Sequence, residues 1–226
     1  MKTAAIVPAL NEEANIGRVL EVLLKSKDLD DVIVVDGGST DNTAGIASKM
    51  GAKVVRVEKC KGKAEAMSIG AKNTDAEVLV FFDADLIGLT QEHISLLVKP
   101  VKEGKAAMCT GVRERWLGLP ELIIKIDPLL AIGGERAVRR FFFEKLPPEF
   151  LRGFMVETGL NYYCRVNKLA ISYAILRGLD IIIKEKKWGF WRGLRNRLKM
   201  IGEIIKVRFL ILAKRREFKD VQKDYS

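Results

Sequence analysis

The sequence predicts an α/β fold in which a mostly parallel sheet is covered by helices on both faces. Strand-like and helix-like patterns alternate over roughly the first hundred residues, which is typical of β-α units. The expected strands, such as "DVIVVD" (31–36), are almost uniformly apolar, as strands buried between two helical layers should be. These strands also end in polar residues, and a parallel sheet brings such ends together along one edge.

The elements are justified in order by their apolar spacing. "TAAIVP" (3–8) is an apolar strand, and the helix opened by Asn11 shows the spacing of one buried face. After the strand at 31–36 we expect a helix at 43–50, a strand at 52–57, a helix at 63–72, a strand at 78–82, a helix from Thr90 and a strand at 106–112. Beyond irregular structure at 112–134 we expect helices at 135–143 and 156–166, a strand at 169–176, and a long helix at 188–216.

Length and cysteine content limit the class of protein. A chain of 226 residues can bury a full core, so we expect one domain with an appendage. Cys60, Cys109 and Cys164 have no metal-ligand spacing, and we interpret them as reduced core thiols. The apolar N-terminal stretch is too short for a signal peptide, and no segment reaches the roughly 20 apolar residues of a membrane span. These features predict a cytoplasmic protein.

The positive charge is confined to one C-terminal segment. Residues 184–216 carry twelve Lys or Arg against two Glu, which accounts for the whole net charge of +10. The rest of the chain is neutral, so nothing predicts nucleic-acid binding. Within this segment, apolar and basic residues alternate at helical spacing, and Trp188 and Trp191 precede the alternating part. It is either a helix packed on the domain or an interfacial helix on an anionic membrane, at the inner face of the membrane.

The stretch "VLVFFDADLIG" (78–88) delivers Asp83 and Asp85 at the end of an apolar strand. Asp is rarely buried unless it is paired, and it is a poor strand former. The carboxylates either accept backbone hydrogen bonds in a turn or form a metal or phosphate site at the carboxyl end of a parallel strand. The residues of this stretch alone favour neither reading.

A second polar strand end is "VIVVDGGSTDNT" (32–43), where two glycines allow a tight turn after Asp36. The turn is not a dinucleotide fingerprint, because no G-x-G-x-x-G follows the strand. "GKAEA" is not a P-loop either, because Ala64 stands where Ser or Thr would be needed. These absences disfavour a dinucleotide- or ATP-binding enzyme. Lys63, at an expected helix start beside the strand ends, is still well placed to meet a phosphate.

Four stretches together carry a family resemblance. In order and spacing, "IVPALNEEANIG", "VIVVDGGSTDNT", "GKAEAM" and "FFDADLIGLTQEHI" resemble glycosyltransferase family 2 sequences of the GT-A fold. Among these, the chain is similar to small enzymes such as glucosyl-3-phosphoglycerate synthases and dolichyl-phosphate mannosyltransferases. The resemblance implies a GT-A domain at 1–183, with a nucleotide-sugar-binding half at 1–112 and an acceptor half at 113–183. Residues 184–226 would be a basic amphipathic helical extension.

The resemblance implies a donor site for a UDP- or GDP-sugar with Mg²⁺ or Mn²⁺. The family's Asp-x-Asp motif maps onto Asp83 and Asp85, which form the metal site. Asp85 is the implied metal ligand and a catalytic residue, and Asp83 faces the ribose or a water on the metal. A divalent cation held by carboxylates and phosphate oxygens offsets the charge of a diphosphate leaving group. Residues implied to bind the rest of the donor are Pro8, Glu12 and Asp36 at the nucleoside and Lys63 at the diphosphate.

The acceptor half is implied by a second set of residues. "GGERAVRR" (133–140) resembles a segment beside the acceptor, where Arg136, Arg139 and Arg140 would bind a phosphate or carboxylate. An ordinary solvated helix face is the other interpretation of these arginines. Glu157 matches a carboxylate near the acceptor and is the candidate general base. A surface helix position would explain it nearly as well.

One position departs from the family pattern. Related small enzymes often place a metal-ligating His in the stretch that matches "DIIIKEKK", and Ile181 stands there instead. The single histidine, His93, is expected in a first helical turn at the surface. Asp85 and the diphosphate would therefore anchor the metal, and metal binding without a nucleotide should be weak.

The sequence therefore predicts an inverting, metal-dependent glycosyltransferase that uses a nucleotide sugar. Its acceptor would be phosphorylated, either a polyprenyl phosphate or a small phosphorylated acid. The alternative is a non-catalytic, membrane-associated protein that binds nucleotide sugars, and the missing His is the one feature that favours it.

Overall fold

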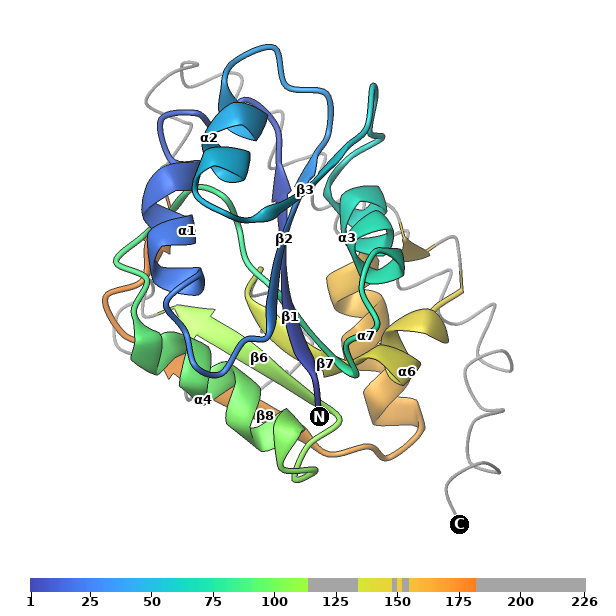
Figure 1. Ribbon diagram of the computed structural model, residues 1–226. Coiled ribbons are helices and arrows are strands. Elements are labelled where there is room, and N and C mark those ends of the chain that lie inside the picture. Colours follow the sequence, from blue (N-terminus) through green and yellow to red (C-terminus); the bar gives the residue numbers. More distant parts are fainter. Residues whose placement is uncertain (114–133, 148–149, 152–154, 182–226) are drawn as a thin grey trace, which may run out of the picture.

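A computed structural model of the chain describes residues 1–113, 134–147, 150–151 and 155–181 (Figure 1). Its main sheet has the strand order β3-β2-β1-β4-β7-β6-β8. The strands are β1 (Thr3–Ala9), β2 (Asp31–Asp36), β3 (Lys53–Arg56), β4 (Val78–Phe81), β6 (Met108–Arg113), β7 (Arg136–Arg139) and β8 (Ile171–Leu176). All of these strands run in parallel except β7, which is antiparallel to both of its neighbours. The predicted mostly parallel sheet is confirmed.

Helices cover both faces of this sheet, as the apolar strands predicted (Figure 1). The helices are α1 (Ile16–Leu23), α2 (Thr43–Lys49), α3 (Lys63–Lys72), α4 (Gln91–Lys102), α6 (Arg140–Glu144) and α7 (Met155–Val166). One face packs against α1, α2 and α4, and the other packs against α3, α6 and α7. Within the described ranges, none of these helices has the length and apolar character that crossing a membrane requires.

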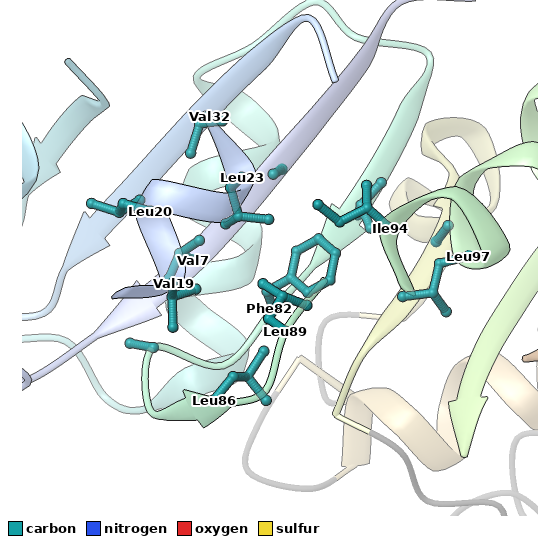
Figure 2. Packing of buried hydrophobic residues seen from close by; sticks show 14 of the residues in the cluster. Val7, Val19, Leu20, Leu23, Val32, Phe82, Leu86, Leu89, Ile94 and Leu97 are labelled. Atoms are coloured by element: carbon teal, nitrogen blue, oxygen red, sulfur yellow. The ribbon is translucent and has the colours of Figure 1, made fainter. Parts of the chain in front are cut away.

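Side chains of each strand alternate between two hydrophobic clusters. In β1, Ala5 and Val7 face the α1 side, whereas Ala4 and Ile6 face the α3 side. Because both sets are buried, the strand must be apolar at every position, which explains the uninterrupted runs in the sequence. On the α1 side, Phe82 from the end of β4 lies among residues of α1 and α4 (Figure 2).

The predicted helix at 135–143 was wrong over its first half. Arg136–Arg139 form β7, which is inserted between β4 and β6, and the helix α6 begins only at Arg140. Ala137 faces one hydrophobic cluster and Val138 faces the other, so a four-residue segment is buried on both faces by its neighbours. Pairing with two strands overrides the local helical pattern.

Other details also differ from the predictions. Asn11 does not open α1; it has a positive φ of 54° in the preceding loop. His93 is in the first turn of α4 but is buried, and its Nε2 lies 3.0 Å from the carbonyl oxygen of Arg177. All three cysteines are free thiols, of which Cys60 is only half-buried. The sequence-based interpretations of 114–133 and of the helix at 188–216 lie outside the described residues.

Candidate active site

The carboxyl ends of the parallel strands bring the predicted donor residues to one edge of the sheet. Ala9, next to Pro8, pairs with Asp36 in the register of β1 and β2. β7 runs in the opposite direction, so it is its first residue, Arg136, that lies at this edge, paired with Phe81 at the end of β4. The topology therefore collects residues from both halves of the chain at one place.

Two loops at this edge are locked together by hydrogen bonds. The amide of Asn11 donates to Oγ of Ser39 at 2.9 Å, and its side-chain oxygen accepts from the amide of Thr40 at 2.9 Å. The amide of Glu12 donates to Oγ1 of Thr43 at 2.9 Å. Glu12 is buried by this arrangement. The loops after β1 and β2 therefore form one unit, with Pro8 half-buried at its base.

Asp36 has one carboxylate oxygen without a hydrogen bond. Its Oδ1 accepts from the amide of Ser39 at 3.0 Å. Its Oδ2 forms an ion pair with Nε of Arg56 at 3.4 Å, but that contact does not have the geometry of a hydrogen bond, so this buried oxygen has no hydrogen-bond partner. A buried acceptor left unmet is costly, so this oxygen can bind an N–H donor of a ligand. The adjacent turn requires Gly38, because its φ is +97° and a Cβ would lie 2.4 Å from a backbone oxygen.

Lys63 lies between Asp83 of the Asp-x-Asp motif and Glu157, the predicted general base. At the first position of α3, its Nζ forms an ion pair with Oδ1 of Asp83 and lies 3.8 Å from Oε1 of Glu157. Glu157 belongs to the first turn of α7 and is buried, so the surface interpretation of this residue is excluded. A Cβ on Gly134 would lie 2.7 Å from Oδ2 of Asp83, so this glycine allows the close approach.

Three further charged groups, Arg113, Glu135 and Arg136, adjoin Lys63, Asp83 and Glu157. We call these six residues the charge network. Arg113 donates from Nε and one terminal nitrogen to Glu135, at 3.0 and 2.7 Å, and that nitrogen lies 3.5 Å from Oδ2 of Asp83. Arg136 donates to the backbone oxygen of Glu157 at 3.2 Å, with 4.0 Å between their charged groups. The sequence reasoning missed Arg113 and Glu135. Arg113 directly follows a predicted strand, which was the signal that could have found it.

Burial and neighbouring charges act on the pKa values of this network in opposite directions. Burial lowers the pKa of Lys63, but nearby carboxylates, Asp83 first, outweigh burial and hold it above its ordinary value. The pKa of Arg113 is also raised, because Glu135 outweighs the effect of burial. At the two most buried groups burial dominates, raising the pKa of Glu135 and lowering that of Arg136. Lys63 and Arg113 are therefore firmly cationic at neutral pH.

Asp83 and Asp85 are the carboxylates that the sequence predicts as the metal site at this edge. Across the described part of the chain, no group of three His, Cys, Asp or Glu side chains is arranged to hold a metal ion. Ile181 pairs with Leu86, the residue after Asp85, in a short sheet of β5 (Leu86–Ile87) and β9 (Asp180–Ile181). Its side chain packs against the hydrophobic cluster instead of supplying a ligand. Two carboxylates suit Mg²⁺ or Mn²⁺ when phosphate oxygens supply further ligands.

The three arginines expected at the acceptor are not brought together. Arg136 is in the charge network, but Arg139 pairs with Val78 at the opposite end of β4. Arg140 follows Arg139, and its guanidinium group donates to backbone carbonyls: Ala76 at 2.6 Å, Ala71 at 2.8 Å, and Thr74. The structure therefore does not place Arg139 or Arg140 beside the other predicted site residues.

Comparisons with known proteins point to one family. The model of the family described as Glycosyl transferase family 2 matches residues 4–169. Glucosyl-3-phosphoglycerate synthase of Mycobacterium tuberculosis (strain CDC 1551 / Oshkosh) is 31% identical over 192 residues, covering 70% of this chain and 59% of that protein. 4,4'-Diaponeurosporenoate glycosyltransferase of Staphylococcus haemolyticus is 38% identical over 96 residues, covering 40% of this chain and 25% of that protein. This chain thus spans less than two thirds of the length of either relative.

Solved structures show the same similarity in three dimensions. Glucosyl-3-phosphoglycerate synthase from Mycobacterium tuberculosis, in complex with Mn²⁺, UDP and glucosyl-3-phosphoglycerate, has a TM-score of 0.67 and 29% sequence identity. The match covers 80% of this chain and 72% of that chain. The complex of the same protein with Mn²⁺, UDP-glucose and phosphoglyceric acid matches with a TM-score of 0.68, at the same identity and coverage.

Proposed function

Because this chain belongs to glycosyl transferase family 2, we propose that it is an inverting, metal-dependent glycosyltransferase that moves a sugar from a nucleotide sugar to a phosphorylated acceptor. The observation that carries the proposal is the arrangement at one sheet edge of Asp36, Lys63 and Asp83. Asp36 has a carboxylate oxygen that can accept a hydrogen bond from a nucleobase, and Lys63 has the positive charge that a diphosphate needs. Asp83, with Asp85, supplies carboxylates for a metal ion. A nucleoside diphosphate presents these three chemistries in the same order.

The donor is proposed to be a UDP-sugar rather than a GDP-sugar. Similar structures at 29% identity are complexes with UDP or UDP-glucose, which supports this choice. Pro8 and Glu12 would line the nucleoside side, and Asp36 would accept an N–H of the base. Lys63 would contact the diphosphate, and the charge it already carries makes that contact a strong one.

The reaction is proposed to be one displacement. Asp85, with Asp83, would hold Mg²⁺ or Mn²⁺, which supplies positive charge to the leaving diphosphate. Lys63 holds the diphosphate in place, while an acceptor hydroxyl attacks the anomeric carbon from the opposite side. Glu157 takes the proton of that hydroxyl. Inversion follows, because the new bond to the anomeric carbon forms on the face opposite the bond to the departing diphosphate.

The acceptor is proposed to be a small phosphorylated acid. Glucosyl-3-phosphoglycerate synthase is among the relatives, and similar solved structures are complexes with glucosyl-3-phosphoglycerate or phosphoglyceric acid, which supports this choice. Arg136 is wholly buried behind Glu157, which leaves Lys63 and Arg113 as the partly exposed cations of the charge network. A polyprenyl phosphate is the alternative acceptor, and an already anionic phosphate would need no general base.

With the alternative acceptor, a polyprenyl phosphate, residues 184–216 are proposed to bind an anionic membrane surface from the cytoplasmic side. Their surplus of basic residues supports this, because each Lys or Arg near an anionic surface contributes about 1 kcal/mol. The protein should sediment with anionic but not neutral liposomes, and less so at high salt. If it stays in solution with anionic vesicles at low salt, the membrane proposal is wrong.

Calorimetric titration tests the donor proposal. UDP-sugars should bind with Mn²⁺ present, and GDP-sugars should bind far more weakly. Asp36→Ala should cost about 1–3 kcal/mol in UDP affinity, because the base loses its acceptor.

Asp85→Asn should abolish nearly all sugar transfer while the fold survives; normal transfer by this variant would contradict the metal assignment. Donor binding without transfer or hydrolysis would favour the non-catalytic alternative.

A further inference from the structure

One terminal nitrogen of Arg113 lies between two carboxylates of the charge network. Its terminal nitrogen donates to Oε1 of Glu135 at 2.7 Å and lies 3.5 Å from Oδ2 of Asp83. Its Nε donates to the other oxygen of Glu135 at 3.0 Å. This two-point contact fixes the plane of the guanidinium group, so the terminal nitrogen that binds Glu135 is also held beside Asp83 of the Asp-x-Asp motif.

Glu135 is built as an anchor for this arginine. The Glu135 side chain is fully buried, whereas 13% of the Arg113 side chain is exposed. The backbone oxygen of Glu135 accepts from the amide of Gly111 at 2.8 Å, which ties the start of β7 to the end of β6. A Cβ on Gly111 would lie 2.5 Å from the side chain of Leu176, so a glycine at 111 lets β6 pack closely against Leu176. The position of Arg113 is therefore set by the sheet and not by a mobile loop.

Asp83 consequently lies between two cations that come from different elements. Lys63, from α3, contacts Oδ1, and Arg113, from β6, lies beside Oδ2. A divalent cation that approaches Asp83 by itself meets repulsion from both. A diphosphate that arrives with the cation carries negative charge to Lys63 and Arg113, so the repulsion is offset.

We propose that Arg113, anchored by Glu135, is a positioning residue that holds Asp83 and competes with the metal for it, so that metal and nucleoside diphosphate bind cooperatively. The inference rests on the proposed function, since it assigns the metal to Asp83 and Asp85. Arg113 and Lys63 neutralise Asp83 before the donor arrives, and their charge offsets that of the diphosphate once it has bound. The coupling is reciprocal: each ligand raises the affinity of the protein for the other by the same factor.

Binding of Mn²⁺, followed by electron paramagnetic resonance of the free ion with and without UDP, tests this without any turnover. In the wild type, UDP should strengthen Mn²⁺ binding. In Arg113→Gln, Mn²⁺ alone should bind roughly 10-fold more tightly than to the wild type, because a competing cation is gone. The factor by which UDP strengthens Mn²⁺ binding should be roughly 10-fold smaller than in the wild type. Arg113→Lys keeps the charge and should leave the binding of Mn²⁺ alone weak. Glu135→Gln leaves the Arg113 side chain in the protein but removes the charge that anchors it, so the coupling should fall.

Arg165→Gln is the matched control, since Arg165 is exposed in the last turn of α7, far along the helix from Glu157. It should bind Mn²⁺ and UDP as the wild type does. Unchanged Mn²⁺ affinity and unchanged coupling in folded Arg113→Gln would overturn the inference and leave the proposed function intact. If Arg113→Gln does not fold, unchanged coupling in Glu135→Gln would overturn it in the same way. A wild type that binds no UDP in the presence of Mn²⁺ would overturn both.

Discussion

Arginines at the two ends of β7 serve different partners, although they belong to one short stretch, "RAVRR" (136–140). Arg136 is fully buried at the site edge, where it meets the carboxylate and the backbone oxygen of Glu157. Arg140, just past the other end, is partly exposed and donates to three backbone carbonyls. The difference teaches that the sheet edge, and not the residue type, decides what an arginine does here.

The physical cause lies in what each edge leaves without a partner. Ala71 is in the last turn of α3, and Thr74 and Ala76 follow in the loop to β4. Carbonyl groups at the end of a helix need donors, and Arg140 supplies them. At the other edge, the first turns of α3 and α7 carry Lys63 and Glu157, so Arg136 meets a carboxylate in addition to a backbone oxygen.

The largest effect should come from Arg136→Met. Removing Arg136 leaves the buried carboxylate of Glu157 with Lys63, 3.8 Å away, as its remaining cation in the charge network. The free energy of unfolding should therefore fall by about 3 kcal/mol, the lower end of the range for a broken buried ion pair. Urea denaturation of the variant and the wild type measures the difference. A loss below about 1 kcal/mol would mean that Arg136 is not a structural partner of Glu157, and the contrast with Arg140 would disappear.

Glu157→Gln should slow the reaction as well as destabilise the fold, because buried Arg136 loses the carboxylate 4.0 Å away but keeps the backbone oxygen of residue 157 as an acceptor. If Glu157 accepts the proton of the acceptor hydroxyl, kcat should fall by about 100-fold or more, with UDP affinity little changed. Glu144→Gln is the matched control, because Glu144 lies 3.3 Å from Arg140 at the other edge and is exposed. A variant that keeps its kcat but binds UDP weakly would show that Glu157 holds Lys63 instead of acting as a base.

Arg140→Met should cost stability without affecting the donor. Three carbonyls lose a charged donor, but water can reach this partly exposed position, so we expect a loss of about 1–2 kcal/mol in unfolding free energy. Titration with UDP and Mn²⁺ should give the wild-type dissociation constant. A clear loss of UDP affinity would show that Arg140 communicates with the site and would remove the distinction between the edges.

The smallest effects should come from two glycines that mark the two edges. In Gly134→Ala, the new Cβ would displace the ends of Asp83 and Lys63, so donor affinity should fall a few-fold while stability changes by less than about 1 kcal/mol. In Gly104→Ala, near Arg139, the φ of +75° should cost about 1 kcal/mol of stability with no effect on the donor. Equal effects of the two variants on UDP binding would contradict the comparison.

Local pattern was sufficient for much of the fold and of the donor side. Uninterrupted apolar runs predicted strands buried on both faces, and the structure confirms that β1, β2 and β4 are such strands. Their polar ends predicted that Asp36 and Asp83 share an edge, because parallel strands all end on the same side. Lys63 was predicted at a helix start for the same kind of local reason, and it does begin α3.

What the sequence by itself determined is therefore the set of elements and motif residues whose signals are periodic and local. The tertiary structure alone decided that Arg136–Arg139 are a strand, that Arg113 meets Glu135 across 22 positions, and that Ile181 lies beside the Asp-x-Asp motif. Each of these depends on pairing between distant segments. A segment of two to four residues has no periodicity of its own, so its neighbours in space determine its conformation and the partners of its side chains.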